Sequence, residues 1–275
     1  MAAPSDRVRR VWREVLELVY PPRCDLCGRL GEPCLCPACA GRIEYLSPPY
    51  CLCCGRPLVP TADAAVLCGE CRLAPPKLAG ARSLGLHLGV LRQAILQLKF
   101  GRRRELAEPL GRLLALRLTA EAAQPNPLDW SRLRALLPVG LHPRRRSWRG
   151  FDQALVLSRT AAREGGWECW ERALVRVKNT RQQIGLSAGE RRANLRGAFQ
   201  VPNPEPMIGG DFLLIDDVYT TGATLEEAAK AVLRAGARAV YGLTLSRAVP
   251  VWHAGTLGSL GDEQDSHPGW NSRSN

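Results

Sequence analysis

The sequence lacks any long apolar segment. No run approaches the ~20 consecutive apolar residues that a membrane-spanning helix needs. The N-terminal stretch MAAPSDRVRRVWREVLELVYPP also lacks the apolar core of a secretory signal, because Arg and Glu side chains interrupt it. Residues 1–20 are instead typical of a short amphipathic helix. We therefore expect a protein without a membrane span that works in the cytoplasm.

Acidic residues are scarce relative to basic ones. The 275 residues include 38 Lys and Arg against 26 Asp and Glu, which gives a formal net charge of +12. This excess predicts polyanionic partners, either phosphate-rich small molecules or nucleic acid, and charge alone does not choose between them. The length allows one core of good size with a small satellite.

Cysteine is abundant, although disulfides are not expected in the cytoplasm. Ten of the eleven cysteines fall within residues 24–71. Each two-residue Cys-x-x-Cys spacer lets a tight turn direct both sulfurs at one ion, and two such pairs complete a tetrahedral site. The pattern therefore predicts two zinc ions in a zinc-ribbon module at residues 21–75. The eight predicted ligands are Cys24, Cys27, Cys36, Cys39, Cys51, Cys54, Cys68 and Cys71.

Energetics favour metal in this module. Ordering ~50 residues costs on the order of 50–100 kcal/mol of backbone entropy, and the segment has few large apolar residues to offset it. One structural zinc contributes about 10–16 kcal/mol. Four thiolates leave no position open for water, so we expect structural rather than catalytic ions. The alternative is a reduced, metal-free loop, and the pairs can combine either in chain order or crosswise.

The stretch LLIDDVYTTGATLEEA (residues 213–228) joins a short apolar strand to two carboxylates, a small-residue turn and a helix start. Unpaired N–H groups and the positive end of the helix dipole favour a phosphate in the turn. Asp216 and Asp217 lie where they can accept hydrogen bonds from two ribose hydroxyls. Because acids repel phosphate unless they bind sugar or a divalent cation, we expect a ribose ligand with Mg²⁺. The turn consists of Thr220, Thr221, Gly222, Ala223 and Thr224.

This stretch resembles the 5-phosphoribosyl 1-diphosphate (PRPP) motif of type I phosphoribosyltransferases, in which apolar residues and two acids precede Thr-Thr-Gly-x-Thr. The resemblance implies a PRPP site. Two alternatives have the same local sequence: a strand whose terminal Asp pair caps a helix, and a metal-binding acid pair.

Residues 76–250 alternate between strand and helix patterns. Apolar runs predict strands at residues 133–139, 172–177, 212–216 and 239–246, and a further strand precedes an amphipathic helix within residues 81–100. This alternation indicates right-handed βαβ units and a parallel sheet, so ligands should bind at the carboxyl ends of the strands. We thus expect an α/β domain after the cysteine module, and a disordered tail at residues 251–275.

Three loops should meet at that edge of the sheet, namely residues 140–150, 178–197 and 216–224. The first is strongly basic, and Arg144, Arg145 and Arg146 are candidates to bind a diphosphate and its Mg²⁺. The alternatives are a solvated basic loop or one that follows a nucleic-acid backbone. Trp148, expected to be buried among the arginines, could pack or stack on a base. The second loop is long enough to close over the site.

With these elements in order, the chain resembles the ComF family, in which a double zinc ribbon precedes a type I phosphoribosyltransferase domain. The resemblance implies that Asp216 and Asp217 hold the ribose hydroxyls and that turn 220–224 holds the 5′-phosphate. It also implies a link to natural competence, in which members act on incoming single-stranded DNA. The matching segments are PPRCDLCG, LKFGRRRELAEPLGRLLA, LPVGLHPRRRSWRGFDQA, NTRQQIGLSAGERRANLRGAF and LLIDDVYTTGATLEEA.

Three functions follow as hypotheses. The first is an enzyme that transfers phosphoribose from PRPP to an unnamed acceptor, with Asp216 and Asp217 as its catalytic residues; positioning and electrostatics would supply most of the catalysis. The second is a factor that handles single-stranded DNA together with DNA-uptake proteins. The third is a PRPP sensor without turnover.

Overall fold

A computed structural model describes residues 20–59, 67–123, 128–180 and 187–249. The predicted N-terminal helix, apart from Tyr20, and the predicted tail lie outside these residues. Within the described ranges, no helix combines the length and apolarity needed to cross a membrane. The helices are α2 (Pro37–Ala40), α3 (Gly69–Leu73), α4 (Gly89–Phe100), α5 (Ala107–Ala123), α6 (Pro143–Arg149), α7 (Gln153–Gly165), α8 (Ala188–Leu195) and α9 (Ala223–Arg234), with 3-10 turns η1 (Arg104–Leu106), η2 (Trp130–Arg132) and η3 (Glu205–Met207).

Four strands form a parallel sheet in the order β1-β6-β5-β2. The two inner strands are β5 (Asp211–Tyr219) and β6 (Ala239–Arg247), flanked by β1 (Gly80–Leu86) and β2 (Leu133–Pro138). The apolar run in β5 is buried on both faces, as the strands of a covered parallel sheet usually are. The predicted α/β class, with a parallel sheet after a cysteine-rich module, is confirmed.

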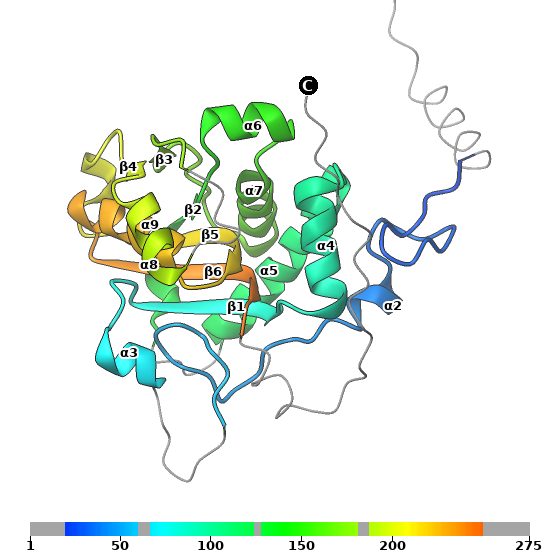
Figure 1. The fold of residues 1–275 in the computed structure, drawn as a ribbon, viewed down its shortest axis with the longest axis horizontal. Coiled ribbons are helices and arrows are strands. Elements are labelled where there is room, and N and C mark those ends of the chain that lie inside the picture. The colour runs from blue at the N-terminus through cyan, green and yellow to red at the C-terminus, as the bar shows by residue number, and fades with distance from the viewer. Residues whose placement is uncertain (1–19, 60–66, 124–127, 181–186, 250–275) are drawn as a thin grey trace, which may run out of the picture.

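The two faces of the sheet carry separate cores. Leu213 and Ile215 of β5 belong to a cluster with the apolar faces of α4, α5 and α7. Phe212 and Leu214 point the other way and join a cluster with α9. This alternation follows from the two-residue period of a strand. Figure 1 shows α8 and α9 on one side of the sheet and α4 on the other.

The cysteine module packs along the β1 edge of the sheet (Figure 1). The Leu46 N–H donates to the Leu84 carbonyl at 3.0 Å, and the Leu86 N–H donates to the Glu44 carbonyl at 2.9 Å. On the α4 side, Asp25 forms an ion pair with Arg103 at 3.5 Å. The module is therefore bonded to the α/β domain through both backbone and side chains.

The strand predicted at residues 172–177 is wrong as a member of the main sheet. Only β3 (Val175–Arg176) forms there, and it pairs antiparallel with β4 (Phe199–Gln200) in a separate two-stranded sheet. The preceding segment already occupies the β2 edge: the Leu136 N–H donates to the Glu168 carbonyl, and the Trp170 N–H donates to the Leu136 carbonyl. No position at that edge remains for residues 172–177.

A buried ionic network joins the module to the domain. Arg82 of β1, which is only 1% exposed, contacts Glu121 of α5 at 3.1 Å. Arg117 contacts the same carboxylate at 2.6 Å, and the Tyr50 hydroxyl donates to it at 2.7 Å. The Arg82 guanidinium also lies 4.5 Å from the centre of the Tyr50 ring, and it donates to the Leu52 carbonyl. Glu121 thus provides the counter-charge that the two arginines share at the junction.

Replacing Glu121 with Ala should lower the free energy of unfolding by about 3–5 kcal/mol, because two arginines would keep their charge without a counter-charge. Urea denaturation measures the loss. Glu108→Ala is the matched control on the same helix, since the Glu108 carboxylate is exposed in its ion pairs with Arg112 and Arg163. That control should cost about 0–1 kcal/mol. Equal, small losses in both variants would contradict the structural role of Glu121.

Candidate functional site

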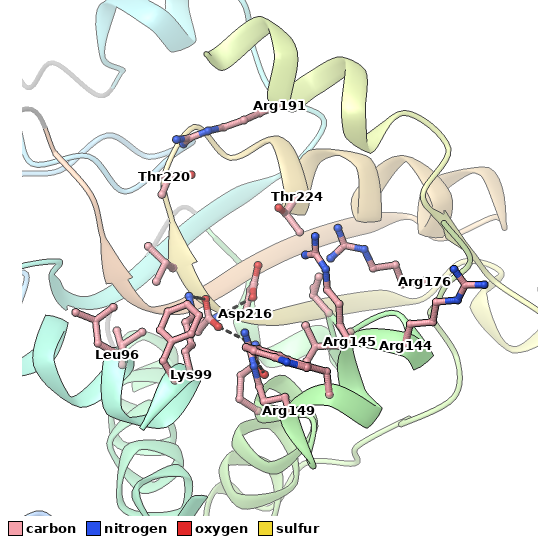
Figure 2. Close-up of a pocket in the computed structure, with 18 of the residues that line it drawn as sticks. Leu96, Lys99, Arg144, Arg145, Arg149, Arg176, Arg191, Asp216, Thr220 and Thr224 are labelled. Atoms are coloured by element: carbon pink, nitrogen blue, oxygen red, sulfur yellow. Dashed lines mark hydrogen bonds and ion pairs between the residues drawn. The ribbon is translucent and has the colours of Figure 1, made fainter. Parts of the chain in front are cut away.

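A pocket of about 600 Å³ lies at the carboxyl end of β5. Its volume falls within the range of small-molecule sites, which is about 300–1,000 Å³. Its walls come from α4, α6, the start of α7, β5 and the turn before α9, as Figure 2 shows. The site residues predicted from the sequence that line it are Asp216, Asp217, Thr220, Thr224, Arg144 and Arg145.

The acid pair is held by neighbours that the sequence motif did not identify. The Lys99 ammonium lies 2.7 Å from one Asp217 oxygen, and the Gln153 amide donates to the other at 2.9 Å. The Asp217 side chain is buried, and its own N–H donates to an Asp216 oxygen at 2.8 Å. Asp216 is more open to the pocket. Asp217 is therefore the fixed member of the pair, and Asp216 is the member presented to a ligand.

These contacts separate the pKa values of the two carboxyls. Burial, reinforced by the Asp217 carboxylate, raises the pKa of Asp216 to about 7. Burial acts in the same direction on Asp217, but Lys99 and Gln153 outweigh it and lower the pKa of that group overall. Near neutral pH Asp217 is therefore ionised, whereas Asp216 exchanges its proton close to that pH.

The turn before α9 has the geometry that the sequence predicts. Gly222 is the N-cap of α9 and has a φ of +79°, a conformation that favours glycine. A Cβ at this position would lie 2.4 Å from the Tyr219 hydroxyl oxygen, so a larger residue would displace the turn. Thr220 and Thr224 face the pocket, and the Thr221 hydroxyl accepts from the Ala223 N–H at 3.4 Å. Thr221, Gly222 and Ala223 shape the turn without lining the pocket.

The segment predicted as a basic loop is largely the helix α6. Pro143 occupies the first turn, the His142 ring accepts from the Arg144 N–H, and Gly150 ends the helix with a φ of +83°. Arg144 and Arg145 line the pocket, whereas Arg146 is exposed and does not. Trp148 is 68% exposed, so its predicted burial is wrong: the helix directs it to the pocket mouth instead of the core.

Three further arginines line the pocket: Arg149 at the end of α6, Arg176 in β3 and Arg191 in α8. Arg149, Arg176 and Arg191 each have a buried Nε atom without a hydrogen-bond partner among the described residues. Burial, with repulsion from Arg145, lowers the pKa of Arg176 to about 10. Arginines whose buried Nε donors are unused favour an anionic ligand that supplies the missing acceptors.

The predicted metal ligands gather into two clusters. Cys24, Cys27, Cys36 and Cys39 form one, and Cys51, Cys54, Cys68 and Cys71 form the other; within each, the sulfurs lie within 4.8 Å of one another. The pairs therefore combine in chain order. Sulfur separations are 3.8 Å for Cys24 and Cys39 and 3.7 Å for Cys54 and Cys68. Tetrahedral zinc, with Zn–S near 2.3 Å, requires about 3.8 Å. The clusters fit two structural zinc ions.

A buried arginine provides an independent test of this fit. Arg247 is 2% exposed, and its Nη2 lies 3.7 Å from the Cys54 sulfur. Its Nε and Nη1 atoms are buried without a partner among the described residues. Neutral thiols would leave this charge unbalanced, whereas zinc bound by four thiolates carries two negative charges. The second cluster is therefore suited to the charged, metal-bound form.

Metal analysis of the purified protein should return two zinc ions per chain. Cys36→Ser should reduce this number to one, because three thiolates hold a structural zinc poorly. Cys169→Ser is the control, since Cys169 belongs to neither cluster, and it should retain both ions. Retention of two ions by the Cys36→Ser variant would contradict the assignment of the first cluster.

Comparison with known proteins identifies the family. A profile of the double zinc ribbon domain matches residues 15–72. DNA utilization protein YhgH of Escherichia coli K12 is 33% identical over 238 residues, which cover 84% of this chain and 99% of that protein. Competence protein F of Haemophilus influenzae is 33% identical over 217 residues, 78% of this chain and 90% of its own. The chain belongs to the ComF family.

Two further matches cover smaller parts of the chain. Competence protein ComFC of Bacillus subtilis is 35% identical over 117 residues, which are 41% of this ComF-family chain and 44% of that protein. Among solved structures, glutamine PRPP amidotransferase from B. subtilis, complexed with ADP and GMP, overlaps 55% of this chain and 30% of its own, with a TM-score of 0.35 and 15% identity. This overlap is too weak to define the ligand.

Proposed function

We propose that this ComF-family protein binds PRPP with Mg²⁺ and transfers its phosphoribose to an acceptor. One observation carries the proposal: a single pocket joins an acid pair at a strand end, a turn at a helix N-terminus and arginines with unused donors. In Figure 2, Thr220 and Thr224 lie on one side of Asp216, and Arg144, Arg145 and Arg176 lie on another. PRPP has matching parts, namely a ribose with a phosphate at one end and a diphosphate at the other.

The 5′-phosphate would bind in turn 220–224. The turn opens α9, a helix of twelve residues, so the first N–H groups of the helix and its dipole favour an anion there. The hydroxyls of Thr220 and Thr224 face the pocket and can donate to phosphate oxygens.

The ribose hydroxyls would bind the acid pair. Asp216 presents its carboxylate to the pocket, while Lys99 and Gln153 orient Asp217. Two carboxylates beside a diphosphate also form the hard oxygen donor set that suits Mg²⁺. Bound Mg²⁺ would offset the negative charge of the diphosphate.

The diphosphate would bind the arginines. Arg144, Arg145 and Arg176 can donate to its oxygens in the bound state and to the charge that grows as the C1′–O bond breaks. The acceptor forms a new bond to C1′ while the diphosphate leaves. Because the pocket only has to align the reactants and stabilise charge, no acid–base triad is needed.

A role in single-stranded DNA handling is the second candidate. The net charge of +12 and the names of the relatives, DNA utilization protein and Competence protein F, support it. DNA binding by phosphate contacts would weaken steeply with salt and would not depend on the acid pair. A PRPP sensor would share the binding site and lack turnover.

Calorimetric titration of PRPP and MgCl₂ into the zinc-loaded protein should detect binding. The double variant Asp216→Asn and Asp217→Asn should weaken it by at least about 100-fold, because two charge-assisted hydrogen-bond acceptors are lost. Asp129→Asn, on the surface away from the pocket, is the matched control.

The titration, followed by an assay for diphosphate release, separates the candidate functions. Diphosphate release from bound PRPP on addition of an acceptor would support the enzyme, whereas binding without release under any acceptor would favour the sensor. Failure of the wild type to bind PRPP would contradict both, and salt-sensitive DNA binding would then become the leading candidate.

A further inference from the structure

The two cysteine clusters pack into different cores of the molecule. Buried cysteines of the first cluster belong to the core that contains α4, α5 and α7, whereas those of the second belong to the core that contains α9. The second core also includes Tyr219, the last residue of β5, and Ala223, the first residue of α9. Among the described residues, only the second cluster therefore shares a core with both ends of the turn.

Arg247, the last residue of β6, connects the second cluster to the end of β5. Its Nη2 atom donates to the Cys54 sulfur at 3.7 Å, and its guanidinium carbon lies 4.0 Å from the centre of the Tyr219 ring. Both Arg247 and Tyr219 are buried. They are also paired between β5 and β6, and the Ala248 N–H donates to the Tyr219 carbonyl at 2.9 Å. The sheet therefore fixes the backbone of both residues, and the guanidinium contacts the sulfur and the ring at once.

The Tyr219 ring supports the turn. A Cβ on Gly222 would lie 2.4 Å from the Tyr219 hydroxyl oxygen and 2.6 Å from the ring carbon that bears it, so the ring packs directly against the Gly222 backbone. The Gly222 carbonyl accepts the Glu226 N–H at 2.8 Å, which is the hydrogen bond that opens α9. A shift of the ring would therefore move the residue at which the helix begins.

A second contact joins the same two regions. Lys77 follows Cys71 by six residues, and its N–H donates to the Glu226 carboxylate at 2.8 Å, in the first turn of α9. Leu78 and Leu225, the neighbours of these two residues, lie in the same core. The segment that leaves the second cluster thus contacts α9 at the end that carries the turn.

We propose that Arg247 is a positioning residue through which the second zinc cluster sets the geometry of turn 220–224. Four zinc-bound thiolates would place negative charge beside the guanidinium, the guanidinium holds the face of the Tyr219 ring, and the ring supports Gly222. An intact second cluster, but not the first, then becomes a condition for anion binding in the turn. This last consequence rests on the proposed function, whereas the coupling itself does not.

Loss of the ion would release these contacts in order. Without zinc, the four sulfurs have no common centre and the negative charge of the metal–thiolate complex is lost. Arg247 is 2% exposed, and its Nε and Nη1 atoms have no hydrogen-bond partner among the described residues. Because a buried cation without a counter-charge is costly, we expect the side chain to move. The Tyr219 ring then loses the cation on its face, and Gly222 loses a fixed support.

Hydrogen exchange of the full-length, zinc-loaded protein tests the coupling without any ligand. The probe is the Glu226 amide, and the reference is the Val139 amide, which donates to the Ile215 carbonyl of β5 at 2.9 Å. Arg247→Met should speed exchange at Glu226 by at least about tenfold and leave Val139 unchanged, because a desolvated cation–π contact is lost. The same variant should release the second zinc ion to a chelator about tenfold faster.

Further variants separate the links of the chain. Arg247→Lys keeps the charge without the flat guanidinium, so it should restore zinc retention and only part of the exchange protection. Tyr219→Leu should speed exchange at Glu226 and leave zinc release unchanged. Cys54→Ser should speed exchange as Arg247→Met does, whereas Cys36→Ser, which disrupts only the first cluster, should not. If Cys54→Ser does not fold, the two Arg247 variants decide the result.

Arg238→Met is the matched control for a general loss of stability. Arg238 precedes β6 at the opposite end of the sheet, and its Nε donates at 2.7 Å to Asp211, which is 2% exposed. Its removal leaves a buried carboxylate without its partner and destabilises the fold, but it breaks no contact between the second cluster and the turn. Exchange at Glu226 should remain that of the wild type.

Two results would overturn the coupling. One is unchanged exchange at Glu226 in an Arg247→Met variant that still melts cooperatively, which would leave Arg247 as a counter-charge for zinc alone. The other is equal acceleration by Arg238→Met or Cys36→Ser, since the effect would then be a general loosening of the fold. Failure of the wild type to bind PRPP would contradict the proposed function and leave the exchange result standing.

Discussion

The position of β5 between β6 and β2 is the constraint on which the rest of the structure depends. Its apolar residues are buried on both faces, so the strand can carry polar groups only where it leaves the sheet. Asp216 and Asp217 lie near the carboxyl end of β5, where β2 has ended, and only Val218 and Tyr219 separate them from the turn into α9. Pairing of Ile215 with Pro138 of β2 and of Asp216 with Thr244 of β6 fixes the backbone at the two carboxyls, and α4 and α7 then add Lys99 and Gln153 around them.

Features that depend on local sequence could be predicted. The Cys-x-x-Cys spacing predicts two metal clusters, and the glycine in Thr-Thr-Gly-Ala-Thr predicts a tight turn before a helix; both follow from short-range geometry. The parallel sheet follows from alternating strand and helix patterns. Which two Cys-x-x-Cys pairs share each ion could not be predicted from the sequence, because chain-order and crosswise pairing both satisfy the same spacing. The positions of the sulfurs in the folded module distinguish them.

Features that depend on distant contacts could not be predicted. Lys99 and Gln153 are polar residues within otherwise amphipathic helices, and nothing in their neighbours marks them as partners of an acid 118 and 64 positions away, respectively. Residues 172–177 have a strand pattern, but residues 168–170 occupy the edge that they would need. Trp148 has the side chain of a core residue, and the caps of α6 decide that it faces the pocket.

The way in which the sheet ends also bears on self-association. An open edge strand presents unpaired N–H and C=O groups to any other chain. Here residues 44–46 hydrogen bond to β1 at one edge, and residues 168–170 do so to β2 at the other. A second copy therefore cannot extend the sheet by adding a strand beside either segment. Beside these two segments, contact between copies would have to use side chains, and the cysteine module protects this part of the β1 edge from strand-to-strand aggregation while the protein remains folded.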